Sequence, residues 1–189
     1  MNNYKIVRLN GVYGDKDAIT SMYNSQTELS LIPYSEQLEL LSQVGTVYSH
    51  GFKEAMKSLG NDAHEIFTNL EPLQKTWASE KNIKYESQNW ELEIVLAQIE
   101  NLKPEVIYFQ SAYHAKRGYA KILKENFSFI KLCVVHSGVP TRYFPDSYID
   151  VLFVGTPGMF KSYKDMGANP TLLYHSFDSA KFEELNLPS

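Results

Sequence analysis

Residues 105–138 read EVIYFQSAYHAKRGYAKILKENFSFIKLCVVHSG. Residues 106–109 and 130–135 are apolar runs with the length of buried strands, and residues 113–125 between them are predicted to form a helix. A strand, a helix and a second strand in this order predict two parallel strands joined by a right-handed crossover.

The same alternation continues on both sides of this segment. Further strands are predicted at 5–9, 64–70, 151–154 and 171–174, and helical patterns at 35–59, 71–81, 89–102 and 159–166. Gly60 and Gly167 follow two of the helical patterns, where a left-handed residue ends a helix. Strands that alternate with helices predict an α/β fold, a three-layer αβα sandwich with a mainly parallel sheet of six or seven strands.

The chain has 189 residues, a length that predicts one domain. We expect this domain to span residues 1–182, followed by the start of an interdomain connector or a frayed tail at 183–189.

The 18 basic and 22 acidic residues form no block of like charge, which argues against a nucleic-acid partner and a polybasic membrane anchor. The lone Cys133 cannot form an internal disulfide, and no segment approaches the roughly 20 apolar residues that span a bilayer. We therefore expect a soluble cytoplasmic protein.

Polar residues follow the predicted strands. In an open parallel sheet the ligand crevice lies beyond the carboxyl ends of the strands, so these residues are the candidate binding residues. They are Asn10, Gly11 and Gly14 after the first strand, Gln110 and His114 after the third, His136, Ser137 and Gly138 after the fourth, and His175 after the last. Loop ends are polar in any case, so for each residue taken alone an ordinary loop is the better explanation.

Three other motifs carry less weight. Asp15-Lys16-Asp17 matches the D-x-D pattern that holds a metal in some nucleotide-sugar enzymes, but it lies in a polar stretch and we interpret it as solvated. The pair Gly11 and Gly14 lets backbone amides approach a ligand, but it lacks the rest of the P-loop and dinucleotide fingerprints. Cys133 lies inside a predicted strand, where a packed core thiol is expected. We predict no metal site.

Two stretches resemble the amino-terminal domain of GT-B type glycosyltransferases. Two others, YSEQLELL (34–41) and YSHGFKEAMKSLGNDAHEIFTNLEPLQKTWASE (48–80), resemble the group 1, family-4-like bacterial branch of this family. LKPEVIYFQ (102–110) is similar to the entry into a central strand of that domain, with Glu in place of the usual Asp. IDVLFVGTPGMFKSYKDMGANPTLLYHSFDSAKF (149–182) is similar to its close, where a last strand leads into a pattern that His175, Asp178 and Phe182 match. The resemblance extends over nearly the whole chain and rests on the order and spacing of these motifs.

The resemblance implies roles for individual residues. In similar enzymes a histidine after the strand that matches CVV faces the interdomain cleft near the reacting sugar, and His136 matches it by position. His136 is therefore the expected catalytic residue, with Ser137 and Gly138 beside the substrate, and Arg117 and Arg142 are candidates for phosphate contact. Glycosyl transfer needs an oriented acceptor hydroxyl and stabilisation of charge on the leaving diphosphate.

The resemblance also implies partners. The expected substrates are a nucleotide-diphosphate sugar as donor and a carbohydrate or glycolipid as acceptor, with no cofactor bound by this domain. A C-terminal donor-binding domain is expected after residue 182, in the same polypeptide or in a separate chain. The intact enzyme is compatible with peripheral membrane association. The sequence differs from the family pattern in the first loop, which has Asn10, Gly11 and Gly14 where many of these enzymes have a Gly-Gly pair.

The alternative to a glycosyltransferase domain is a non-catalytic αβα binding or scaffold module without transferase activity.

Overall fold

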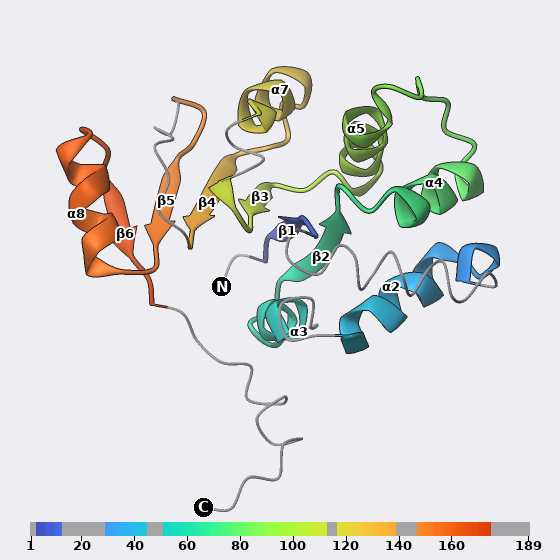
Figure 1. Ribbon diagram of the computed structural model, residues 1–189, viewed down its shortest axis with the longest axis horizontal. Coiled ribbons are helices and arrows are strands. Elements are labelled where there is room, and N and C mark those ends of the chain that lie inside the picture. The colour runs from blue at the N-terminus through green and yellow to red at the C-terminus, as the bar shows by residue number, and fades with distance from the viewer. Residues whose placement is uncertain (1–2, 13–28, 45–50, 113–116, 139–146, 175–189) are drawn as a thin grey trace, which may run out of the picture. The chain divides into compact units, whose positions relative to one another are not determined.

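The computed structural model describes residues 3–12, 29–44, 51–112, 117–138 and 147–174 (Figure 1). Within them, six parallel strands form one sheet in the order β2-β1-β3-β4-β5-β6. The strands are β1 (Lys5–Asn10), β2 (Asp62–Phe67), β3 (Val106–Phe109), β4 (Leu132–Ser137), β5 (Val151–Val154) and β6 (Pro170–Leu172). The predicted α/β, Rossmann-like sandwich with a mainly parallel sheet is confirmed.

The helices begin and end where local chemistry favours it. In the described residues they are the short 3₁₀ helix η1 (Leu29–Leu31), α2 (Tyr34–Val44), α3 (Gly51–Ser58), α4 (Glu71–Glu80), α5 (Trp90–Leu102), α7 (Tyr119–Asn126) and α8 (Pro157–Asp165). Pro72 lies in the first turn of α4, where a missing N–H costs nothing, and the hydroxyl of Thr156 caps α8 by accepting from the N–H of Met159 at 3.2 Å. Gly60 and Gly167 have φ of +86° and +87°, so both predicted left-handed stops are confirmed.

The chain divides into two compact units. One comprises Met1–Asn10, Met56–Ile66 and Ile99–Ser176, and it contains nearly all of the sheet with α7 and α8. The other comprises Gly11–Ala55, Phe67–Gln98 and Phe177–Ser189, and it contains η1, α2 and α4. The single domain over residues 1–182 with a connector or tail at 183–189 stays a prediction, because residues 175–189 lie outside the described part of the chain.

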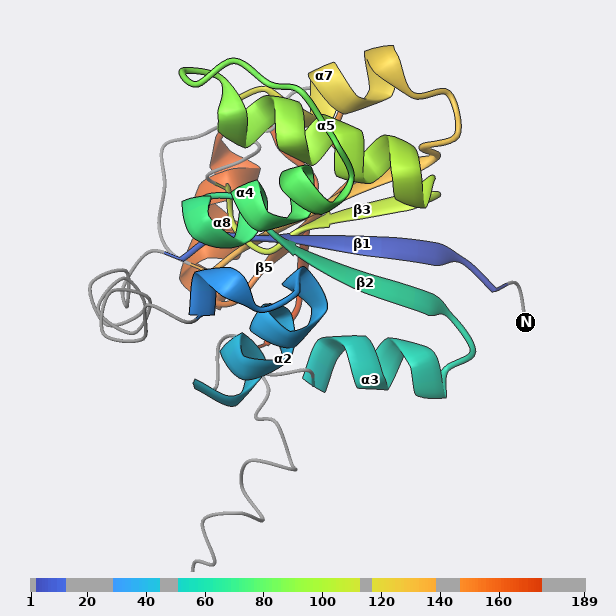
Figure 2. The same cartoon turned by 90° about the vertical axis from the view of Figure 1, so that its right-hand side faces the viewer.

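Alternate residues of each strand lie on opposite faces of the sheet. On the first face, here called the Val7 face, six side chains are fully buried: Val7, Leu9, Ile107, Phe109, Cys133 and Val135. The hydroxyl of Tyr163 on α8 lies 3.0 Å from that of Ser137, which is on this face, so α8 covers it. The crossovers β3–α7–β4 and β5–α8–β6 run in the same direction across the sheet, so right-handed connections place α7 on the same side (Figures 1 and 2). The buried thiol confirms that Cys133 is a core residue. The second face carries Arg8 and Asn10 of β1 and is here called the Arg8 face.

Some boundaries differ from the predicted ones. β4 continues two residues beyond its predicted end, because His136 pairs with Phe153 and Ser137 with Val154 of β5. The prediction that His136 and Ser137 follow the strand is therefore wrong, since both lie inside it. The same holds for Asn10, which is the last residue of β1 and not the first residue after it. The helical pattern at 35–59 is divided between α2 and α3, with residues 45–50 outside the described part.

Asp150 fastens the start of β5 to β4. Its N–H donates to the carbonyl of Cys133 at 2.9 Å, and its Oδ2 accepts from the N–H of Cys133 at 2.7 Å. The same Oδ2 accepts from Nζ of Lys124 at 2.6 Å. One residue thus satisfies both backbone groups of a buried strand residue, which sets the register of β4 and β5.

We predict that Asp150→Ala lowers the free energy of unfolding by about 1–3 kcal/mol, because it removes the carboxylate that accepts from the buried N–H of Cys133 at 2.7 Å. Urea unfolding followed by circular dichroism measures the change. Asp165→Ala is the matched control, since Asp165 pairs with Lys161 of its own helix on an exposed surface. Equal unfolding midpoints for the two variants would contradict this role of Asp150.

Candidate functional site

Three predicted site residues lie at one level of the sheet. The register pairs Leu9 with Phe109, and the N–H of Gln110 donates to the carbonyl of Leu9 at 3.1 Å. One residue further along, Asn10, Gln110 and His136 occupy equivalent positions at the carboxyl ends of β1, β3 and β4. Because side chains alternate along a strand, Asn10 and His136 belong to the Arg8 face, and Gln110, the first residue after β3, lies between them in a line about 10 Å long. We call these three residues the polar row.

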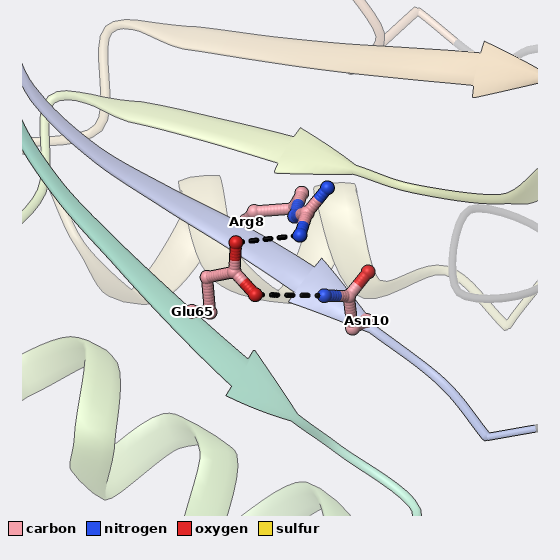
Figure 3. Close-up of polar contacts among 3 residues, drawn as sticks. All are labelled: Arg8, Asn10 and Glu65. Atoms are coloured by element: carbon pink, nitrogen blue, oxygen red, sulfur yellow. Dashed lines mark hydrogen bonds and ion pairs between the residues drawn. The ribbon is translucent and has the colours of Figure 1, made fainter. Parts of the chain in front are cut away.

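Glu65 of β2 binds two side chains of β1 (Figure 3). Nη2 of Arg8 donates to Oε1 of Glu65 at 2.5 Å, and Nδ2 of Asn10 donates to Oε2 at 3.3 Å. All three side chains are buried, with 7%, 2% and 7% exposure for Arg8, Asn10 and Glu65. The carboxylate of Glu65 on β2 therefore binds two side chains near the end of the neighbouring strand β1.

Tyr108 of β3 lies beside Arg8 in the register. Burial raises the pKa of the Tyr108 phenol, and the positive charge of Arg8 acts in the opposite direction. The phenol is therefore protonated at neutral pH. Next to the polar row, the Arg8 face thus presents an ion pair of zero net charge and a neutral hydroxyl.

Asn69 holds the chain where it leaves β1. Its Oδ1 accepts from the N–H of Val12 at 2.7 Å, and its Nδ2 donates to the carbonyl of Val12 at 2.8 Å. This side-chain amide satisfies both backbone groups of Val12, so it fixes the chain immediately after Gly11. Gly11 itself is half-buried.

The two polar residues that end β4 lie on opposite faces. His136, 7% exposed, belongs to the Arg8 face, and Ser137, 1% exposed, belongs to the Val7 face. The hydroxyls of Ser137 and Tyr163 of α8 are 3.0 Å apart and share a hydrogen bond. This contact gives Ser137 a structural role, and its contact with a substrate stays a prediction. Gly138 follows the strand and is half-buried.

The remaining candidates are placed as follows. Gly14, His114, Arg142 and His175 lie outside the described residues, as do Asp15 and Asp17 of the D-x-D motif. Arg117 is exposed, with its guanidinium carbon 5.5 Å from the ring centroid of Tyr119.

In the described residues, no group of three or more His, Cys, Asp and Glu side chains can hold a metal ion. No helix of the same part of the chain is long and apolar enough to cross a membrane.

Arg8 and Glu65 are the site residues that the sequence analysis missed. Each is a charged residue inside a short apolar strand, in KIVRLN and DAHEIF. Two opposite charges at buried strand positions are a signal for an ion pair between neighbouring strands, because an unpaired buried charge is strongly disfavoured. That signal was present in the sequence.

No protein-family model matches the chain, and no curated protein or solved structure matches it. The assignment of function therefore rests on the residues and geometry of the chain itself.

The Ser137–Tyr163 contact predicts a pH effect on stability. Burial raises the pKa of the Tyr163 phenol, and its hydrogen bond with Ser137 only partly offsets this. A raised pKa means that the folded state favours the protonated phenol. The stability it contributes is present below the unfolded pKa of about 10 and is lost as pH rises through the folded pKa. We expect Tyr163→Phe to lose less stability than the parent chain between about pH 8 and pH 10.5.

Urea unfolding at the two pH values measures this difference. Tyr174→Phe is the control, because Tyr174 is 64% exposed. The expectation fails if Tyr163→Phe and Tyr174→Phe show the same loss of stability at the higher pH.

Proposed function

We propose that the chain is the amino-terminal, acceptor-binding domain of a GT-B type glycosyltransferase. Such an enzyme transfers a sugar from a nucleotide-diphosphate donor to a polysaccharide or glycolipid acceptor. The observation that carries the proposal is the polar row, because ligands of open parallel sheets bind beyond the carboxyl ends of the strands. The motifs at 102–110 and 149–182, which resemble this family, support the same assignment.

The polar row has chemistry suited to a sugar. The amides of Asn10 and Gln110 each carry a donor and an acceptor, which match the hydroxyl groups of a carbohydrate. An imidazole such as that of His136 can orient the reacting hydroxyl or take its proton. Asn10 and His136 are residues of β1 and β4, and Gln110 directly follows β3, so the site is held more rigidly than one built from loops alone.

In this proposal the donor sugar is bound outside the polar row. The donor's nucleotide is bound by a C-terminal domain, with the transfer occurring in the cleft between the two domains. The intact enzyme works in the cytoplasm, with peripheral contact to the membrane where the acceptor is a glycolipid. No cofactor or metal is assigned to the acceptor side.

A non-catalytic αβα module is the second candidate. The observation that favours it is the burial of His136, which at 7% exposure resembles a structural strand residue as much as a catalytic one. A scaffold module would keep the parallel sheet and the ion pair of Arg8 with Glu65, but it would transfer no sugar. The two candidates therefore differ in a measurable activity.

The experiment is to express the full product of the reading frame that encodes residues 1–189 and to measure release of nucleoside diphosphate. Uridine, guanosine and thymidine diphosphate sugars are the donors, each with and without a mixture of simple glycosides. We expect release that depends on the glycosides. Residues 1–189 alone should show no transfer and should bind each donor more weakly than about 1 mM. Micromolar donor binding by residues 1–189 would contradict the acceptor-side assignment.

A second test concerns His136. We predict that His136→Ala lowers turnover of the full product by a factor on the order of 10², after correction for the folded fraction. Because His136 is buried, some loss of stability is also expected, about 1–3 kcal/mol. His64→Ala is the control, since His64 pairs with Asp62 away from the polar row. An unchanged rate per folded molecule would remove His136 from the site.

A further inference from the structure

We draw no further inference here: the strongest candidate, the half-buried apolar part of the Arg8 face formed by Tyr108 of β3 and by Val151 and Phe153 of β5, carries nothing, because nothing in the described residues shows what covers it.

Discussion

The parallel pairing of β1, β3 and β4 is the constraint on which the site depends. Because all strands run in one direction, their carboxyl ends meet at one edge, and the register brings Asn10, Gln110 and His136 to one level there. A shift of one residue in any of these strands would move its polar residue to the opposite face. Contacts such as those of Asp150 with Cys133 are important for this reason, since they fix the register from outside the site.

The ion pair of Arg8 with Glu65 shows how the sheet tolerates polar groups in its interior. Removing two charges from water is costly, and buried pairs often contribute little net stability compared with apolar residues of the same size. The pair is more readily explained by specificity, because it binds β1 to β2 in one register and holds the side chain of Asn10. Tyr108 extends the same environment to β3 as a neutral, half-buried hydroxyl.

Much of the fold follows from sequence patterns, and the exceptions have physical reasons. The sequence predicts the bounds of β3 and β5, because their short apolar runs end before Gln110 and Gly155. The predicted end of β4 is two residues short, because the change to polar residues at His136 suggests a strand end, whereas pairing with β5 extends the strand through Ser137. Asn10, Gln110 and His136 were predicted from their places after strands, but the partner of Asn10 was not. Glu65 is far away in the sequence, and only the strand order brings it beside β1.

The central claim is that one sugar binds across the ends of β1, β3 and β4. The most direct measurement is a crystal structure of the chain soaked in the three methyl glycosides at high concentration. The account predicts electron density for a sugar ring at the carboxyl edge of the sheet, in contact with the side chains of Asn10 and His136. A sugar bound at the amino edge, or one that touches neither side chain, would contradict it.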